Sequence, residues 1–527
     1  MIHHFLENSA ARFPNKTALI HGDIRATYAQ INTAANSLSA WLVDNKISIG
    51  DRVAILLENS LEYVISYYAI LKTGAIAVPL STAHKPDTLN PLLAELEPKA
   101  IITSKKFQRL LNAADPTLIK NSKLIIKNFS SALSPKNFHI IKFTDTISSN
   151  ITENPTVSAN ERLADETASI IYTSGSTGKP KGVMLSHGNI VSNTAAICQY
   201  LELAENDIQM AVLPFFYVMG KSLLNTHFAV GGTVVINNKF AFPADVINEM
   251  IRERVTGFSG VPSTYAYLLH RSPLARKRDQ LGTLRYCSQA GGHMAATTKR
   301  ALRQALPRHT KIFIMYGATE AAARLSYLPP EQFENKMGSI GKPIPGVKLR
   351  VMDKSGNELP AGEKGEIVAH GENIMQGYWR DPEGTAGVLD SNGYHTGDIG
   401  YTDKEGFFYV ESRKDSLVKV SGHRLNPQEI EDALIATNMI IESAVMGIPD
   451  PLRGNKLVAL IVPQNGDCTP KKLLEACASK LPKYKLPSEI KLTRILPKNP
   501  NGKIDKQKCT AMFHAPPATI KNYTPSF

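Results

Sequence analysis

The sequence has 527 residues, little cysteine and no long apolar run. Its five cysteines are scattered, and no two of them have CxxC spacing. Such a set argues against a disulfide framework or a structural zinc site, and it favours a reducing compartment such as the cytoplasm. No uninterrupted apolar stretch reaches the roughly 18 residues of a membrane span, so we expect no membrane-spanning helix. The first residues also lack the basic and apolar regions of a secretory signal.

The composition is that of a large globular enzyme. Hydrophobic residues make up 43% of the chain and charged residues 20%, which allows a substantial buried core. The formal net charge is +13, and from Ser416 onward 16 Lys and Arg stand against 9 Asp and Glu. A basic C-terminal unit favours an anionic partner such as a nucleotide, coenzyme A or an acidic carrier protein, although solubility alone would also explain it. Aromatic residues are not interleaved with the basic ones, so we expect no nucleic acid partner.

The hydrophobic pattern changes twice along the chain. Short apolar runs at 53–57, 100–103, 123–127 and 139–142 alternate with helical spacing such as that of 62–71, which predicts parallel α/β layers. After about Gly338 the chain is rich in Gly, Pro and short β-like runs, as in a β-rich subdomain. A compact α+β unit follows Asp415, with helices predicted at 427–437 and 470–480. The last twenty residues look like a loose tail.

The most informative segment is IIYTSGSTGKPKGVML at 170–185. An apolar strand runs into hydroxyl residues and glycines, followed by two lysines. Glycines let backbone N–H groups approach a phosphate, and hydroxyls and lysines add donors and charge. A P-loop would require GxxxxGK[ST], but Thr173 occupies the first glycine position and Pro180 follows Lys179. The segment therefore predicts a phosphate-binding loop of another kind.

This loop closely resembles the signature of the adenylate-forming superfamily, which includes acyl-CoA synthetases, luciferases and the adenylation domains of peptide synthetases. Four further motifs follow in the superfamily's order: YGATE at 316–320, YHTGD at 394–398, RKDSLVKVSGHR at 413–424 and PNGK at 500–503. The resemblance spans about Tyr28 to Lys506. Any one short motif recurs by chance, but five in order do not.

The resemblance implies a fold and a division into domains. The fold is α/β, with a large N-terminal domain of two α/β subdomains plus a β-rich subdomain, and a small mobile C-terminal α+β domain. The expected bounds are 1–414 for the AMP-binding domain, 415–510 for the C-terminal lid and 511–527 for the tail. Asp415 would be the hinge, and Lys419 and Gly422 would belong to the hairpin presented to the thiol.

The implied reaction joins a carboxylic acid to ATP, giving an acyl adenylate and pyrophosphate, after which a thiol displaces AMP. Lys503 would bridge the carboxylate and the α-phosphate, with Thr319 and Glu320 completing the catalytic set. Glu320 and Thr173 would hold Mg²⁺, which prefers oxygen ligands. The implied ATP- and AMP-binding residues are Thr173, Ser174, Gly175, Ser176, Thr177, Gly178, Lys181, Gly291, Gly292, Tyr316, Gly317, Asp398 and Arg413.

The acid is expected to lie against Phe215, Tyr217 and Met219. Phe and Met in this wall favour an apolar acid, fatty first, over an amino acid, and aryl acids stay open. Tyr217 stands where relatives often have His, and a phenol supplies no positive charge at neutral pH. Three functions remain at this stage: an AMP-forming acyl-CoA synthetase, a ligase that loads an acyl-carrier protein or stops at the adenylate, and a silent ligand-binding relative. The first is the prediction, with ATP, Mg²⁺ and coenzyme A as cofactors and co-substrates. The oligomeric state cannot be read from the sequence.

Overall fold

The computed structural model describes residues 1–120, 122–127, 139–144, 164–173, 180–414, 417–420, 423–450 and 454–514. The predicted loop residues 174–178, the predicted hinge Asp415 and the predicted hairpin residue Gly422 lie outside these ranges. Among the described residues, no helix is long and apolar enough to cross a membrane.

The first α/β layer is an eight-stranded sheet with the order β19-β9-β8-β4-β3-β5-β6-β7. The six strands β8, β4, β3, β5, β6 and β7 run parallel, and each has apolar residues in succession, as expected for a parallel sheet covered on both faces. The predicted strands and the predicted parallel pairing are therefore confirmed. The strands are β3 (Arg52–Leu56), β4 (Ile76–Pro79), β5 (Ala100–Ser104), β6 (Lys123–Lys127), β7 (His139–Lys142), β8 (Thr167–Thr173), β9 (Lys181–Ser186) and β19 (Gly377–Tyr378).

The second α/β layer is a nine-stranded sheet with the order β16-β15-β14-β13-β12-β10-β11-β1-β2. Its strands are β1 (Thr17–His21), β2 (Ile24–Thr27), β10 (Ile208–Ala211), β11 (Thr233–Ile236), β12 (Gly257–Gly260), β13 (Tyr286–Gln289), β14 (Lys311–Tyr316), β15 (Ser326–Leu328) and β16 (Lys342–Pro343). The N-terminal strand β1 pairs in parallel with β11, more than two hundred residues later. The chain therefore starts in this sheet, leaves it to build the first one, and then returns.

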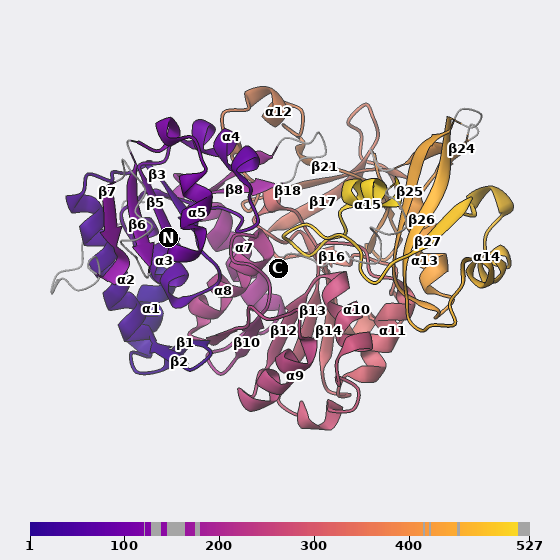
Figure 1. Cartoon of the computed structure of the whole chain (residues 1–527), viewed down its shortest axis with the longest axis horizontal. Helices are drawn as coiled ribbons and strands as arrows, with labels where there is room; N and C mark the ends of the chain where they lie inside the picture. Colours follow the sequence, from indigo (N-terminus) through magenta and orange to yellow (C-terminus); the bar gives the residue numbers. More distant parts are fainter. Residues whose placement is uncertain are drawn as a thin grey trace.

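Helices fill the space between the two sheets and cover their outer faces (Figure 1). They are α1 (His4–Arg12), α2 (Tyr28–Asp44), α3 (Leu61–Lys72), α4 (Pro86–Leu96), α5 (Gln108–Asn112), α7 (His187–Tyr200), α8 (Val218–Val230), α9 (Pro243–Arg252), α10 (Pro262–Arg271) and α11 (Ala296–Ala305). The local sequence determines where two of these helices begin. Thr27 and Gln30 form a capping box at the N-terminus of α2, and the Ser60 hydroxyl accepts a hydrogen bond from the Tyr63 N–H at the N-terminus of α3.

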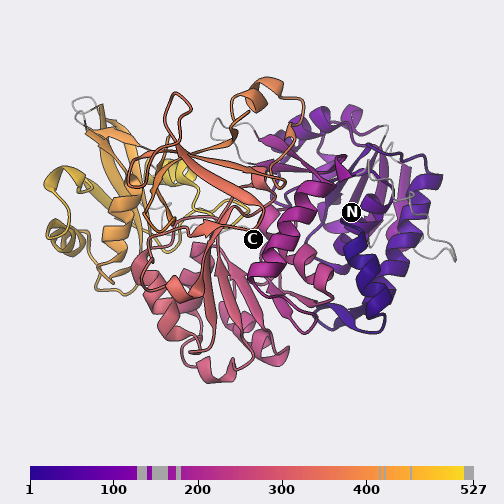
Figure 2. The same ribbon diagram turned by 180° about the vertical axis from the view of Figure 1, so that it is seen from behind.

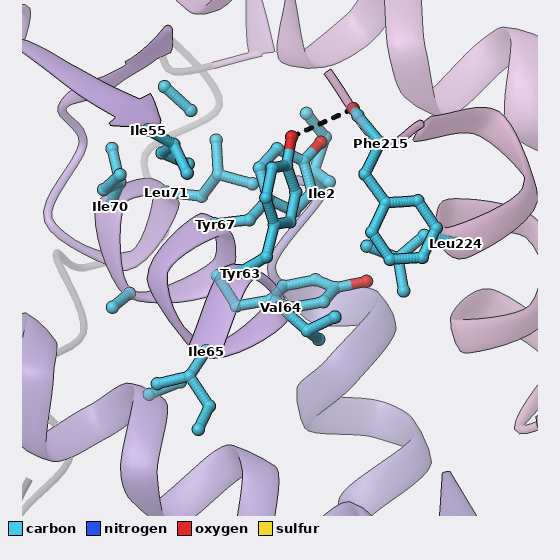
Figure 3. Close-up of a cluster of buried hydrophobic side chains, with 14 of the residues drawn as sticks. Ile2, Ile55, Tyr63, Val64, Ile65, Tyr67, Ile70, Leu71, Phe215 and Leu224 are labelled. Carbon is cyan, nitrogen blue, oxygen red and sulfur yellow. Dashed lines mark hydrogen bonds between the residues drawn. The ribbon is translucent and has the colours of Figure 1, made fainter. Parts of the chain in front are cut away.

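One apolar cluster contains residues of both sheets and of α1, α2, α3 and α8. Figure 3 shows its centre, where Tyr63 and Tyr67 of α3 meet Phe215 and Leu224. The Tyr63 hydroxyl donates to the carbonyl oxygen of Phe215 at 2.9 Å, so the buried phenol is satisfied. This core fixes the first sheet against the second.

The predicted β-rich subdomain is a five-stranded antiparallel sheet, seen in orange above the second sheet in Figures 1 and 2. Its strands are β17 (Val347–Met352), β18 (Gly365–Gly371), β20 (Leu389–Asp390), β21 (Gly393–Thr402) and β22 (Phe408–Arg413), and the short helix α12 (Pro382–Ala386) precedes β20. The subdomain bridges the large sheets and the C-terminal part.

The C-terminal part begins with the antiparallel pair β23 (Val418–Val420) and β24 (His423–Leu425). It continues with a sheet of β25 (Ile440–Asp450), β26 (Gly454–Pro463) and β27 (Glu489–Leu492), packed with α13 (Pro427–Ile435) and α14 (Pro470–Ala478). The prediction of a loose tail is wrong for its first residues, because α15 (Lys506–His514) is helical. Cys509 and Phe513, one turn apart on this helix, are buried in an apolar cluster with residues of β25 and β26.

Candidate active site

Three of the predicted nucleotide-binding residues meet where β14, β21 and β22 end or bend. The Tyr316 hydroxyl donates to Oδ2 of Asp398 at 2.6 Å, and Nε of Arg413 lies 3.1 Å from Oδ1. Arg413 also donates to the carbonyl oxygen of Thr396 at 3.3 Å. Asp398 and Arg413 are register partners on β21 and β22, so the antiparallel pairing itself brings the ion pair together.

Asp398 is a buried carboxylate among donors. Burial raises the pKa of Asp398, while Arg413, the Tyr316 hydroxyl and Lys503 favour its ionised form. A carboxylate with oxygens held by a phenol and a guanidinium is an acceptor fixed in one orientation. It can bind a pair of neighbouring hydroxyl groups, such as those of a ribose.

Lys503 reaches a backbone turn of the large N-terminal part. Its Nζ lies 5.9 Å from the centre of the Tyr217 ring. Gly291 has a φ of +83°, and a Cβ built on it would lie 3.5 Å from Cε of Lys503 and 3.5 Å from the Tyr217 phenol oxygen. Both groups therefore lie within contact distance of this turn, whose left-handed φ favours glycine. Lys503 itself stays exposed.

Two contacts hold the C-terminal part in this arrangement. The Ser263 hydroxyl at the start of α10 donates to the carbonyl oxygen of Gly502 at 2.7 Å. Nε2 of His293 lies 2.8 Å from Oδ2 of Asp432 on α13. Both contacts connect the two parts of the chain beside Gly291, and the first of them places the residue next to Lys503.

A second cluster lies around Glu320, in the turn Thr319–Ala321 after β14. The Tyr378 hydroxyl donates to Oε1 of Glu320 at 2.9 Å, and Nζ of Lys181 lies 4.6 Å from the centre of the Tyr378 ring. Lys181 pairs in register with Thr173 across the β8–β9 hairpin, so the predicted phosphate loop joins two antiparallel strands. A P-loop would instead lead from a strand into a helix.

The two predicted metal ligands, Glu320 and Thr173, fit Mg²⁺ in chemistry. Glu320 supplies a carboxylate and Thr173 a hydroxyl, and Mg²⁺ takes oxygen ligands. The Tyr378 hydroxyl holds one carboxylate oxygen, which fixes the orientation of the other. Tyr378 was missed in the sequence, since it lies 58 residues from Glu320 and only the fold joins them.

The backbone between Gly317 and Arg324 is strained. Ala322 has a φ of 52° and Ala323 a φ of 125°, both left-handed values that are costly for a residue with a side chain. A Cβ on Gly317 would lie 2.1 Å from the carbonyl oxygen of Ala323, so the chain folds directly back on this glycine. Strain of this kind gathers at functional sites, where it fixes side chains in place.

Gly317→Ala is therefore expected to destabilise the protein by about 2–3 kcal/mol, because the methyl group would overlap a backbone carbonyl that cannot turn aside. Urea unfolding followed by circular dichroism would measure the loss. Gly282→Ala is the matched control, since a Cβ there meets no atom of the described residues within 4 Å. Equal stability of the two variants would mean that the turn can relax.

The predicted acyl wall divides between two apolar clusters. Met219, fully buried, belongs to a cluster that also contains Tyr200, Tyr286 and Met315, which we call the acyl-side cluster. Tyr217 packs against this cluster and also against the core around α3. Phe215 lies in that core, where its ring centre is 5.5 Å from that of Tyr63. Tyr217 and Met219 thus share the acyl-side cluster, and Phe215 lies apart from it.

The remaining predicted residues take varied positions. Thr319 is buried beside Glu320, and Gly292 is exposed after Gly291. Lys419 is exposed on β23, and its carbonyl oxygen accepts from Asn455 at 3.0 Å. Sequence reasoning missed Arg324, although a charged residue after three alanines and before Leu325 is an unusual pattern for a buried segment.

Comparisons with known proteins agree with this geometry. The profile of the AMP-binding enzyme family matches residues 6–379, and that of the AMP-binding enzyme C-terminal domain matches residues 429–503. A long-chain-fatty-acid–CoA ligase of Bacillus subtilis is 32% identical over 529 residues, covering 95% of this chain and 93% of that protein.

Two solved structures are similar in fold over nearly their whole length. An anthranilate CoA ligase, AuaEII, in complex with anthranoyl-AMP superposes with a TM-score of 0.87 at 27% identity, covering 97% of this chain and 96% of that one. O-succinylbenzoate coenzyme A synthetase (MenE) from Bacillus subtilis, in complex with ATP and magnesium ion, gives 0.80 at 26% identity, covering 96% and 99%.

The predicted fold class is confirmed, and ATP, Mg²⁺ and coenzyme A are the cofactors and co-substrates. The chain belongs to the AMP-binding enzyme family and is an acid–thiol ligase, an AMP-forming CoA ligase.

Proposed function

We propose that this ligase activates an acid with an apolar body, as a fatty acid has, and transfers it to coenzyme A. The observation that carries the proposal is the approach of Lys503 to Gly291 and Tyr217, at the edge of the acyl-side cluster. A cation at that edge can bring the carboxylate and the α-phosphate together, two anions that otherwise repel each other. The apolar side chains beside it favour the body of such an acid over a charged amino acid.

The other residues then take complementary roles. Asp398 binds the ribose hydroxyls, with Arg413 and Tyr316 holding its two oxygens, and Tyr316 also faces the adenine. Gly291 and Gly292 allow the backbone to approach the base, and Thr319 and residues 173–178 with Lys181 bind the phosphates. Glu320 and Thr173 hold Mg²⁺, which neutralises charge on the triphosphate when bound.

The C-terminal part acts as a mobile lid in this proposal. The proposed domains are 1–414 and a C-terminal lid that starts at 415 and includes α15 to His514, with rotation about Asp415. After adenylation the lid withdraws Lys503 and presents the hairpin of Lys419 and Gly422 to the thiol. The Ser263 and His293 contacts to Gly502 and Asp432 are among the bonds that such a rotation would break, as is the bond from Arg271 to the carbonyl oxygen of Arg494.

Two further points belong to the proposal. The fatty-acid relative supports a fatty acid, and the anthranilate and O-succinylbenzoate ligases support an aryl acid as the second candidate. The names of these relatives identify them as coenzyme A ligases or synthetases, which favours coenzyme A over an acyl-carrier protein as the thiol. The scattered thiols, all five free, favour the cytoplasm.

A ladder of fatty and aryl acids, each with ATP, Mg²⁺ and coenzyme A, tests the acid. We expect kcat/KM for pyrophosphate release to rise with chain length by about threefold or more per added methylene until the acyl-side cluster is filled, since each buried methylene contributes about 0.8 kcal/mol. Short polar acids serve as the control. A rate independent of chain length, with an aryl acid preferred, would replace the fatty acid by the second candidate.

A further inference from the structure

Arg324 is a buried cation that the reaction above does not use. It is 2% exposed, and no other arginine among the described residues is buried. Its Nε donates to Sδ of Met315 at 3.4 Å, and its Nη1 donates to the carbonyl oxygen of Ala323 at 3.1 Å. Within the described ranges no carboxylate lies within ion-pair distance of it. A sulfur atom, a carbonyl and the neighbouring Tyr200 phenol carry no full negative charge, so the guanidinium has no counter-ion among the described residues.

Several lysines with buried amino groups either pair with a carboxylate or can lose their proton. Lys72 pairs with Glu7, and Nζ of Lys498 lies 2.9 Å from Oε1 of Glu442. Lys221 and Lys299 have no carboxylate partner among the described residues, but they are amines that can lose the proton. Burial lowers the pKa of Lys221 well below its ordinary value and that of Lys299 to about 8. A guanidinium group cannot lose its proton in this way, because its pKa is so high that it stays charged in a protein.

Arg324 lies next to the acyl-side cluster. Met315, which its Nε contacts, belongs to the acyl-side cluster, as does Tyr200. Burial lowers the pKa of Arg324, and the phenols of Tyr200 and Tyr217 are close enough to oppose that shift. Tyr217 also faces Lys503. Arg324, through Met315, and Lys503, through Tyr217, therefore both border the acyl-side cluster, and only Lys503 has a task in the reaction proposed above.

Arg324 is held firmly in this place. Nδ2 of Asn193 and Nδ2 of Asn373 both donate to its carbonyl oxygen, at 2.8 and 2.9 Å. The strained residues Ala322 and Ala323 precede it directly. A fixed, desolvated guanidinium is an arrangement suited to a carboxylate, which it can meet through two parallel hydrogen bonds.

We propose that Arg324 is a specificity-determining residue, and that the preferred substrate is an apolar-bodied acid carrying a second carboxylate, which supplies the missing counter-ion. This inference rests on the proposed function, because Lys503 must take the reacting carboxylate. The substrate class is then dicarboxylic acids, aliphatic or aryl, in place of simple fatty acids.

The test pairs each dicarboxylic acid with its own monomethyl ester, which keeps the body and removes the second charge. We expect wild-type kcat/KM for pyrophosphate release with coenzyme A to favour the diacid by about 10- to 100-fold, the range for a hydrogen bond to a charged group. Arg324→Gln should remove this preference, chiefly by raising KM for the diacid. Arg324→Lys should keep part of it.

Arg303→Gln is the matched control, since Arg303 on α11 bonds to backbone carbonyls such as those of Leu306 and Thr310. It should leave the diacid-to-ester ratio unchanged. An equal loss on diacid and ester in Arg324→Gln, or a wild-type enzyme that uses both equally well, would overturn the inference. Far-UV circular dichroism identifies a variant that fails to fold, and in that case the ratio for Arg324→Lys decides.

A binding measurement separates this inference from the proposed function. Thermal unfolding of wild type and Arg324→Gln is followed with each diacid and ester in the presence of AMP. Thermal stabilisation of wild type by a diacid, without stabilisation of Arg324→Gln, would support the site even if no acid turned over. The absence of any turnover would overturn the proposed function. Turnover of fatty acids with no stabilisation by any diacid would overturn this inference and leave the proposed function standing.

Discussion

Lys503→Ala is expected to slow formation of the acyl adenylate by about 100-fold or more. Lys503 is the cation that the structure brings to Gly291 and Tyr217 from the C-terminal part. Without it the carboxylate and the α-phosphate must approach with their repulsion unscreened, and stabilisation of developing charge is among the largest contributions to such a rate. Pyrophosphate release with saturating ATP and acid would measure the loss.

The same variant should still form the thioester from a supplied acyl adenylate, because in the proposed lid rotation Lys503 withdraws before the thiol attacks. Lys508→Ala is the matched control, since Lys508 is an exposed residue of α15 that pairs with Asp505 at 3.0 Å. Both half-reactions should be unchanged in that control. Loss of both half-reactions in Lys503→Ala, with the fold intact, would count against two separate lid positions.

Asp398→Ala is expected to raise KM for ATP by about 100-fold, with a smaller effect on KM for the acid. The substitution removes the acceptor for the ribose hydroxyls, and it also leaves Arg413 and the Tyr316 hydroxyl without the carboxylate that both contact. Hydrogen bonds to a charged group contribute about 1.5–3 kcal/mol each, so losing one bond near the upper end of this range already corresponds to about 100-fold. Initial rates at varied ATP would give the value.

Asp390→Ala provides the comparison for Asp398. Asp390 lies on the neighbouring strand β20 and contacts His395 at 3.2 Å, without contact to Tyr316 or Arg413. Its KM for ATP should match that of wild type. If Asp398→Ala bound ATP as well as the control does, the ribose role would be excluded and Asp398 would have a structural task only.

Local sequence predicted much of the fold. The runs at 53–57 and 123–127 correspond to strands β3 and β6 because three to five consecutive apolar residues fit a short strand covered on both faces. The pairing of β1 with β11 was not predictable in this way. Nothing in residues 17–21 distinguishes one sheet from another, and the choice depends on the packing of α1 against α8.

The residues of the site also differ in whether local sequence predicts them. Tyr316, Asp398 and Lys503 stand in motifs that a resemblance can carry, and the structure brings the first two into contact. Tyr378 and Ser263 act through partners far away in the sequence, Glu320 and Gly502, so no local pattern indicates them. Arg324 becomes informative only once its burial and its lack of a carboxylate partner among the described residues are known.

The central claim is that adenylation and thiol transfer occur in one chain, with coenzyme A as the acceptor. Pyrophosphate release with ATP, Mg²⁺ and the best acid, with and without coenzyme A, tests it most directly. We predict a burst of about one equivalent per site without coenzyme A and sustained turnover, with acyl-CoA as the product, in its presence. A burst that coenzyme A cannot relieve, but an acyl-carrier protein can, would contradict the claim.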